Sequence, residues 1–241
     1  MLHKTQGIVL NYIRYSETSI ISKIYTSAFG LESFIVNGVR KPNSRFPIAY
    51  FQPLTLLNME IYFHQKRNLQ RIRWMECSYL FTEIPTHIYK MSVAQFLTEV
   101  VIHSIKEQEK NEPLFNFLKE SIIHLEETNE NISNFHVSFL IQFSRFLGFY
   151  PMNNFSTANK YFHLGEGKFH STHSNPLYEL DEKISFEFFK FFEMKYEQAA
   201  SHILGYQTRK ILLDAIIKYY QLHLEGFRDL KSVKVLTEVL K

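Results

Sequence analysis

The sequence predicts an α+β chain in which a small β-barrel precedes an all-α domain. Two observations lead to this fold class. From residue 5 to about residue 80 there are five short runs with the two-residue alternation of strands, and no segment of helical period is long enough for a crossover. After Pro85 the apolar residues recur with the period of a helix. Five short strands in so short a segment are typical of a closed or partly open barrel.

The five predicted strands follow one another with short turns. The strand-like runs cover residues 8–13, 20–25, 34–36, 55–63 and 69–79. The fourth has the longest alternation, which predicts one buried face made of Thr55, Leu57, Met59, Ile61 and Phe63. A turn at 65–68 joins it to the fifth in a hairpin. The alternation of the fifth sets one group of side chains against another: Arg71, Arg73 and Met75 against Ile72, Trp74 and Glu76.

The helical part begins with an apolar stripe on residues 93–104, at spacings of three and four. A second helix opens at Glu112, and a third lies between Ser133 and Gly148. Residues 149–182 hold the prolines, glycines and asparagines of a loop or hairpin insertion. Helix resumes at Ser185 with a phenylalanine-rich segment for which core packing is the favoured interpretation, and again over 207–224. The predicted domains are therefore 1–83 and 84–241, with 149–182 as a loop-rich insertion.

The composition is that of an ordinary folded protein, with 241 residues of which 45% are hydrophobic. A single cysteine, Cys77, excludes an intrachain disulfide and any cysteine-rich zinc module. No apolar run reaches the ~18–20 residues of a membrane span, and the first residues lack the apolar core of a signal peptide. We expect a cytoplasmic protein in a reducing compartment, with no membrane partner.

The charge is unevenly distributed along the chain. Residues 1–83 hold ten Lys and Arg against five Glu, a balance of +5, whereas residues 84–241 have a balance of −2. Such an asymmetry favours an anionic partner for the N-terminal part, either nucleic acid or an acidic protein surface. A solvated strand face remains the alternative.

Signs of catalysis are weak. The segment 165–168 lacks the remaining glycine and the Ser or Thr of a phosphate loop, and the three Asp are dispersed. The strongest candidate for a metal-dependent enzyme is a group of loop histidines, His163, His170 and His173, with Glu166 as a further ligand. Solvated or packing histidines are the favoured interpretation. No catalytic residue, metal or cofactor is predicted.

The basic residues of the barrel are the candidates for nucleic-acid binding. If the strand phase holds, Arg71 and Arg73 project from one face, roughly 6.5–7 Å apart, a spacing at which a face can follow a phosphate backbone. Four tyrosines are available for stacking: Tyr12, Tyr15, Tyr25 and Tyr62. The full set of candidate DNA-binding residues is Arg14, Lys23, Arg40, Lys41, Arg45, Lys66, Arg67, Arg71 and Arg73. A protein-only adaptor whose barrel binds an acidic partner is the competing hypothesis.

Short motifs at both ends of the chain resemble the RecO family of bacterial recombination mediators. At the N-terminus these are Gly7-Ile8-Val9-Leu10, Tyr15-Ser16-Glu17, Tyr25-Thr26 with Gly30-Leu31, Gly38-Val39-Arg40-Lys41 and Leu54-Thr55. At the C-terminus they are Tyr220-Gln221-Leu222-His223-Leu224 and Leu230-Lys231-Ser232. The resemblance implies an OB-fold barrel joined to a helical domain. It also implies non-enzymatic binding of single- and double-stranded DNA, annealing of complementary strands, and help in loading RecA onto strands coated by single-strand-binding protein (SSB).

The resemblance implies two protein partners, RecR and the acidic, Phe-ended C-terminal tail of SSB, and a place in the cytoplasm with the nucleoid. An apolar notch with a basic rim would suit that tail. The candidate rim residues are Arg209, Lys210, Arg228, Lys231 and Lys234. Many relatives carry a four-cysteine zinc site in the helical domain. The matching insertion here, 149–182, has no cysteine, so zinc is not carried over.

Overall fold

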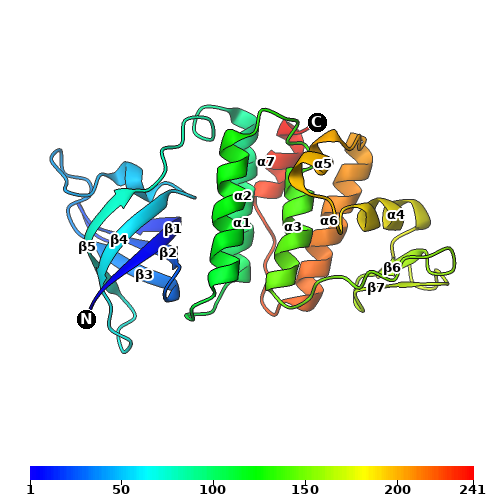
Figure 1. Ribbon diagram of the computed structural model, residues 1–241, viewed down its shortest axis with the longest axis horizontal. Helices are drawn as coiled ribbons and strands as arrows, with labels where there is room; N and C mark the ends of the chain where they lie inside the picture. The colour runs from blue at the N-terminus through cyan, green and yellow to red at the C-terminus, as the bar shows by residue number, and fades with distance from the viewer. The chain divides into compact units, whose positions relative to one another are not determined.

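The computed structural model describes residues 1–241 as two compact units, Met1–Glu127 and Thr128–Lys241 (Figure 1). The first unit contains a five-stranded barrel and the two helices that follow it. The second contains the remaining helices and a small hairpin. The division predicted at 83/84 follows the change of secondary structure, whereas the division into compact units falls after the second helix.

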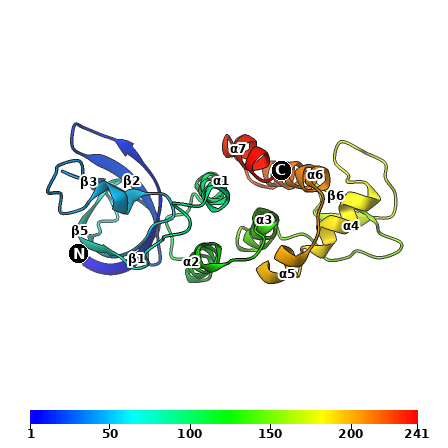
Figure 2. The same cartoon turned by 90° about the horizontal axis from the view of Figure 1, so that it is seen from above.

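The barrel is formed by strands β1 (Leu2–Arg14), β2 (Ile20–Thr26), β3 (Gly30–Val36), β4 (Leu56–Tyr62) and β5 (Gln70–Cys77). They close in the order β1-β2-β3-β5-β4, and every neighbouring pair is antiparallel except β3 with β5. This is the arrangement of an OB-fold, so the predicted fold class is confirmed. Figure 2 shows the strands curving round the core of the barrel.

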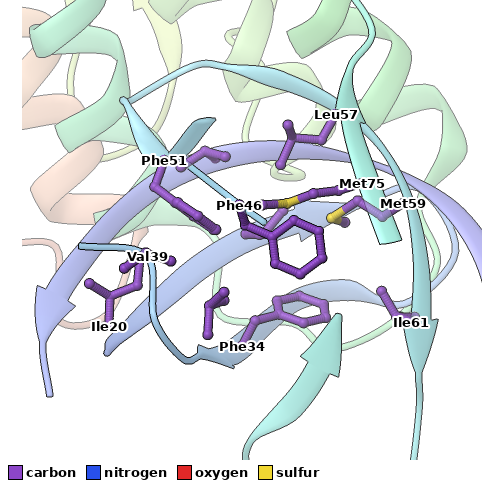
Figure 3. Close-up of a cluster of buried hydrophobic side chains, with 12 residues drawn as sticks. Ile20, Phe34, Val39, Phe46, Phe51, Leu57, Met59, Ile61 and Met75 are labelled. Atoms are coloured by element: carbon purple, nitrogen blue, oxygen red, sulfur yellow. The ribbon is translucent and has the colours of Figure 1, made fainter. Parts of the chain in front are cut away.

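Alternate side chains of the strands point inward and fill the barrel (Figure 3). The predicted buried face of the fourth strand is there, because Leu57, Met59 and Ile61 all belong to the core. The long connection between β3 and β4, which includes a short 3₁₀ helix (Ile48–Phe51), adds Val39, Phe46 and Phe51. Gly7 of β1 lies against the core residue Met59: a Cβ at this position would stand 2.5 Å from Met59 Cε.

A β-bulge on β5 changes the predicted phase of that strand. Met59 pairs with Met75 and Glu60 with Trp74, but Ile61 pairs with Ile72, so Arg73 is an extra residue. A bulge places two consecutive residues opposite one and bends the strand. Arg71 and Arg73 are both exposed, but Arg73 is the extra residue, so the regular two-residue spacing predicted between them on one face is interrupted. Met75 does not share their exposure: it is buried in the core, and Trp74 and Glu76 are exposed. The prediction for Met75 was wrong because alternation restarts after the extra residue.

Helices α1 (Ile88–Ser104) and α2 (Glu112–Glu127) cover one side of the barrel. Tyr25 of β2 points outward but is buried, because its ring stacks on Phe115 at a centroid distance of 6.2 Å. The β2–β3 turn approaches the α1–α2 connection so closely that a Cβ on Gly30 would lie 2.5 Å from the Glu109 carbonyl oxygen. Gly30 also has φ +68°, so both the close approach of the two segments and the backbone conformation require glycine at this position.

The segment between β5 and α1 is held by the carboxylate of Glu126, which is buried at the end of α2. Its Oε1 accepts hydrogen bonds from the backbone N–H of Thr82 at 2.6 Å and of Glu83 at 2.8 Å, and Oε2 accepts from that of Ile84 at 2.8 Å. Buried Lys90 donates to the Glu126 carbonyl oxygen at 2.6 Å. A negative charge therefore satisfies three consecutive backbone donors and ties the end of the barrel to both helices.

The second unit is built around α3 (Phe135–Phe146) and α6 (Tyr206–His223). They are joined where the buried Tyr220 hydroxyl donates to the Leu140 carbonyl oxygen at 2.6 Å. The shorter helices are α4 (Glu182–Lys190), α5 (Tyr196–Ser201) and α7 (Ser232–Val239). The predicted insertion contains the hairpin of β6 (Tyr161–His163) and β7 (Lys168–His170). None of the helices is long and apolar enough to cross a membrane.

Aromatic packing closes the second unit over this hairpin. Phe162 and Phe169 are buried and pack edge-to-face against each other, and Phe162 also meets Phe188 of α4 at 4.6 Å between ring centroids. Phe191 and Phe192 are buried as well, so the phenylalanine-rich segment packs in the core as predicted, apart from the exposed Phe186.

Glu126 generates the first testable prediction. Replacing it with Gln removes the charge and turns one acceptor into a donor, so the buried N–H groups of 82–84 are no longer all satisfied. We expect the free energy of unfolding to fall by about 1–3 kcal/mol at neutral pH. Urea denaturation of the full chain, followed by circular dichroism, measures this. The control is Glu120→Gln, an exposed residue of the same helix, for which no loss is expected.

The same carboxylate predicts a pH dependence. Burial alone would raise the pKa of Glu126, but the hydrogen bonds from Glu83, Ile84 and Thr82 outweigh it and lower the pKa from the ordinary 4.5. The stabilisation is therefore present above the ordinary pKa and is lost as the pH falls through the lowered one. Glu126→Gln lacks this component, so the difference in stability between it and the natural chain should shrink in acid. A difference independent of pH would contradict the assignment.

Candidate nucleic-acid interface

The outer wall of the barrel divides into a covered and an open part. Ile8 and Tyr25 point outward but are buried in the first unit, where α1 and α2 pack. Farther along the same strands a row of directly paired outward residues crosses the wall: Ile13, Ile21, Ile35, Arg71 and Tyr62. Ile13 and Tyr62 have exposed fractions of 60% and 52%. The open part is thus an apolar row with one arginine in it.

The predicted basic residues lie around this row rather than in one cluster. Arg71 is the second residue of β5 and closely follows the β4–β5 hairpin, which carries exposed Lys66 and Arg67. Its partner Ile35 lies near the end of β3, from which the chain leads to exposed Arg40 and Lys41.

The β1–β2 turn joins that group, because the Arg40 N–H donates to the Thr18 carbonyl oxygen at 3.5 Å and Arg14 ends β1 just before the turn. Lys23 is exposed on β2, two residues from Ile21. We call these residues the basic band: Lys66, Arg67, Arg71, Lys23, Arg40, Lys41 and Arg14.

Two predicted residues, Arg45 and Arg73, lie elsewhere on the barrel. They line an open groove of about 720 Å³ over the outer faces of β1, β4 and β5, together with Lys4. Glu60 in the same groove holds Arg73 at 3.4 Å and Lys4 at 3.9 Å. Because exposed ion pairs are worth little in water, a phosphate can compete for either cation.

The tyrosines differ in their availability for stacking. Tyr15 and Tyr62 are exposed, whereas Tyr12 packs partly against the barrel core. Tyr25 is unavailable because its ring is buried against Phe115. The same burial, with a smaller contribution from Glu107, raises the pKa of its hydroxyl to about 12. The sequence could not show that a helix some ninety residues later covers this strand position.

Sequence reasoning missed two residues of the groove, Lys4 and Trp74. Lys4 stands in the first residues of the chain, which carry no strand signal of their own but form the long start of β1. Trp74 was assigned to the face opposite the arginines, and the bulge at Arg73 turns it outward instead. Trp74 is the only tryptophan of the chain, and this was the one feature of the composition that could have drawn attention to it. In the structure 40% of its surface is exposed.

The five candidates for tail binding lie in the second unit. Lys210, Arg228, Lys231 and Lys234 are exposed on α6, α7 and the segment between them. Arg209 is half buried, because its guanidinium donates to the carbonyl oxygens of Leu204 and Leu240 and so holds the end of α7. The pit beside Arg209 and Lys210 has a volume of about 10 Å³, enough for one water molecule but not for a phenylalanine ring.

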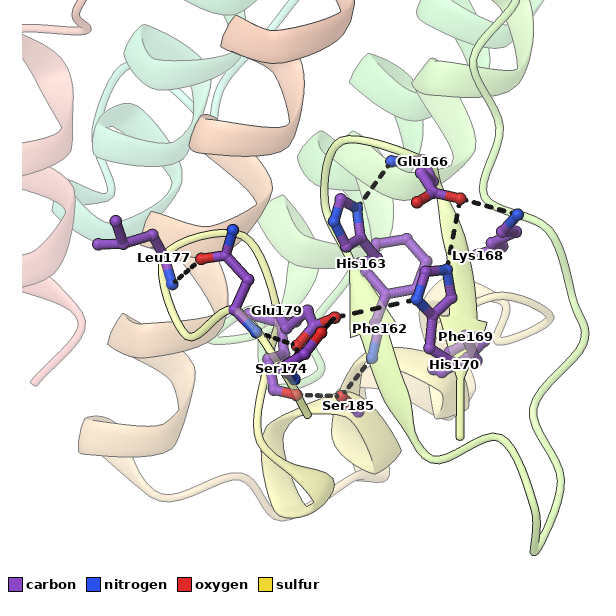
Figure 4. A network of polar contacts seen from close by, with 12 residues as sticks. Phe162, His163, Glu166, Lys168, Phe169, His170, Ser174, Leu177, Glu179 and Ser185 are labelled. Atoms are coloured by element: carbon purple, nitrogen blue, oxygen red, sulfur yellow. Dashed lines mark hydrogen bonds and ion pairs between the residues drawn. The ribbon is translucent and has the colours of Figure 1, made fainter. Parts of the chain in front are cut away.

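The loop histidines do not converge as a set of metal ligands. His163 and His170 (Figure 4) stack at 5.1 Å between ring centroids. His173 stacks instead on Tyr161. His170 Nε2 lies 3.4 Å from Glu166, whose carboxylate also pairs with Lys168 at 2.7 Å. No group of three or more His, Cys, Asp or Glu side chains is arranged to hold a metal ion.

Glu179 takes the structural role in this loop. Its buried carboxylate accepts hydrogen bonds from the backbone N–H of Ser174 at 2.6 Å and of Asn175 at 2.7 Å (Figure 4). The Asn175 N–H makes the largest contribution to lowering the pKa of this carboxyl, against the effect of burial. The loop beyond the hairpin is therefore folded round a carboxylate.

The comparison with known proteins decides the family. The family model described as "Recombination protein O N terminal" matches residues 1–81, and the one described as "Recombination protein O C terminal" matches residues 85–233. The chain belongs to the RecO family. The resemblance predicted from the two ends of the sequence is confirmed, and the second match extends it through the middle of the chain. The family places this RecO protein in DNA repair and recombination.

Similar full-length RecO proteins come from several bacteria. Those of Flavobacterium psychrophilum and Flavobacterium johnsoniae, each named DNA repair protein RecO, are 36% and 35% identical, with 98% of each chain covered. The DNA repair protein RecO of Phocaeicola vulgatus is 36% identical with 99% of both chains covered. The barrel with its basic band corresponds to the RecO N-terminal match.

Proposed function

We propose that this RecO protein is a non-enzymatic mediator that binds single- and double-stranded DNA, anneals complementary strands and helps to load RecA onto strands coated by SSB. The observation that supports this most directly is the basic band, which runs along the part of the barrel wall that α1 and α2 leave open. The family assignment and the OB-fold support the same conclusion. Its working place would be the cytoplasm, with the nucleoid.

Annealing in this proposal is electrostatic. Two DNA strands repel each other through their phosphates, and a surface that neutralises several phosphates releases condensed counterions and lowers that repulsion. The band needs no base-specific contact for this step, so it suits any sequence. Arg71 is central, since it lies between the hairpin with Lys66 and the loop with Arg40.

The absence of a catalytic step is also part of the proposal. The groups that would perform one are engaged otherwise. Burial raises the pKa of the Cys77 thiol, which disfavours the reactive thiolate. His163 accepts a hydrogen bond from the backbone N–H of Glu166, and Glu179 is occupied by backbone donors.

The proposed protein partners are RecR and the C-terminal tail of SSB. For the tail, the exposed cations of α6 and α7 would supply the basic rim. Because Arg209 already ties down the end of α7, a phenylalanine ring would enter beside it only if α7 shifted. The tail site would then form on binding.

One observation favours the adaptor alternative for the barrel. The open wall carries an apolar row, Ile13, Ile21, Ile35 and Tyr62, which is a better surface for protein than for phosphates. An adaptor would not be retained on immobilised single-stranded DNA at low salt, whereas the proposed mediator would be.

The second testable prediction concerns Arg71 of the basic band together with Arg73 of the groove. In the variant Arg71→Ala/Arg73→Ala we expect weaker binding of single-stranded DNA and a shallower slope of log K against log salt, by about 0.7 for each phosphate that is no longer neutralised. Fluorescence anisotropy of a labelled oligonucleotide at several salt concentrations gives both quantities. Lys183→Ala, an exposed residue of the second unit, is the matched control. An unchanged affinity and slope would remove both arginines from the proposal.

The third prediction addresses annealing. Complementary oligonucleotides coated with SSB should pair faster in the presence of this protein, and the acceleration should decline as salt is raised. The double variant of Arg71 and Arg73 should lose most of it. Pairing can be followed by energy transfer between labelled strands. Equal acceleration by the natural chain and the variant would contradict a role for these arginines in annealing.

The fourth prediction addresses the tail. An acidic peptide ending in Phe should bind more tightly than the same peptide without it, since the aromatic ring is the anchor and the rim charges mainly affect orientation and encounter rate. Calorimetric titration measures both. Lys210→Ala/Lys234→Ala should weaken both peptides, and Lys66→Ala in the barrel serves as the control. Equal affinity of the two peptides would contradict an apolar notch.

A further inference from the structure

The groove over β1, β4 and β5 contains an exposed aromatic side chain, Trp74, that makes no stacking contact within the protein. Trp74 lies on the outer face of β5, opposite Glu60 of β4, and 40% of its surface is exposed. No ring or cation of the protein stacks on its indole. The bulge at Arg73 is what turns it outward, and bulges of this kind re-aim side chains next to functional sites.

A chain of polar side chains runs across the floor of the groove beside Trp74. Lys119 of α2 donates to Gln6 Oε1 at 3.3 Å, and Gln6 Nε2 donates to Asn58 Oδ1 at 3.3 Å. Asn58 Nδ2 then donates to Glu76 Oε1 at 3.2 Å. This series of hydrogen bonds fixes the orientation of the side-chain amides of Gln6 and Asn58. It ends at the Glu76 carboxylate, whose second oxygen remains an acceptor.

Glu76 and Trp74 project from the same face of β5, two residues and roughly 6.5–7 Å apart. A flat ring lying on the indole would therefore present its edge toward the free carboxylate oxygen. That oxygen can accept from an N–H donor, and the exocyclic amino group of cytosine or adenine provides one at the edge of the base. Thymine has no exocyclic amino group, and the N3–H of its edge lies between two carbonyl oxygens that the carboxylate repels.

The rim of the groove provides cations for a phosphate. Arg45 reaches it from the connection before β4, and Lys4 and Arg73 share the carboxylate of Glu60. An aromatic platform, an edge acceptor and a cationic rim together match the three parts of a nucleotide: its base, the edge of that base and its phosphate.

We infer that this groove binds one unpaired nucleotide of single-stranded DNA, with its base stacked on Trp74 and its amino group donating to Glu76. The inference rests on the proposed DNA binding and deepens it. A base inside a duplex is already stacked and paired, so the groove is selective for single strands, whereas the basic band serves both forms. The groove thus adds a preference for amino-bearing bases to a charge-based surface.

The experiment uses the fluorescence of the natural chain, because Trp74 is its only tryptophan. Oligo(dC), oligo(dT), an abasic oligonucleotide of the same length and a duplex are titrated in turn, and anisotropy of a label on the DNA records binding in parallel. We expect quenching of Trp74 by oligo(dC), weaker quenching by oligo(dT), and little by the abasic strand or the duplex. Binding of oligo(dC) without quenching would overturn the inference.

Two variants separate stacking from charge. Trp74→Ala should lower the affinity for oligo(dC) by roughly 5- to 100-fold, the range for one base–aromatic stack, with the salt slope unchanged and duplex binding unaffected. Trp74→Phe should restore most of the affinity. Tyr89→Ala on α1, an exposed aromatic residue outside both the groove and the basic band, is the matched control. A loss for Tyr89→Ala as large as that for Trp74→Ala would contradict the site.

Glu76→Gln tests the base edge. Glutamine keeps an oxygen that can accept from Asn58 but replaces the free carboxylate oxygen, so the preference for oligo(dC) over oligo(dT) should disappear. A preserved preference would refute the role of Glu76. The two proposals fail differently: no retention of any DNA would refute the proposed function, whereas DNA binding that is indifferent to Trp74 would refute only the nucleotide site.

Discussion

Closure of five strands into a barrel is the constraint on which the rest of the first unit depends. Starting at Leu2 of β1 and moving round the barrel through paired residues, the path returns to β1 at Ile13 rather than at Leu2: it passes Tyr62, Arg71, Ile35 and Ile21. This offset tilts the strands strongly. The register therefore determines which side chains face outward together, and it brings the start of β5 between the β4–β5 hairpin and the end of β3. The basic band is a consequence of that register.

Each unit also depends on a buried carboxylate that accepts hydrogen bonds from consecutive backbone N–H groups. Glu126 does this for the segment 82–84, and Glu179 does it for Ser174 and Asn175. In both cases hydrogen bonds to the charged form lower the pKa of the carboxyl despite burial. These segments have little apolar surface of their own, so a fixed negative charge gives them one conformation. The chain has a single cysteine, so no intrachain disulfide can hold these segments in place, and the two buried carboxylates restrain them instead.

The sequence predicted what depends on local periodicity. The alternation over 55–63 correctly predicted the buried side chains Leu57, Met59 and Ile61, and the helix-period segments mark the helices. It failed where one extra residue or a distant contact decides. Nothing in Ile72-Arg73-Trp74 announces a bulge, so Met75 was placed on the wrong face. Tyr25 is buried by Phe115, and Arg209 is engaged by Leu240, contacts that no pattern within a short window can reveal.

The barrel thus presents two surfaces with different physics. Attraction between the basic band and phosphates is long-ranged, is screened by salt and does not distinguish one base from another. Stacking on Trp74 acts only at contact, is nearly insensitive to salt and requires a base that is free of its partner. In the groove the charges of Lys4, Arg45 and Arg73 are largely offset by Glu60 and Glu76, so charge alone would hold a strand there weakly. A mediator that must hold strands and still let them pair gains from this separation, because pairing withdraws the base from Trp74 while the phosphates stay on the band.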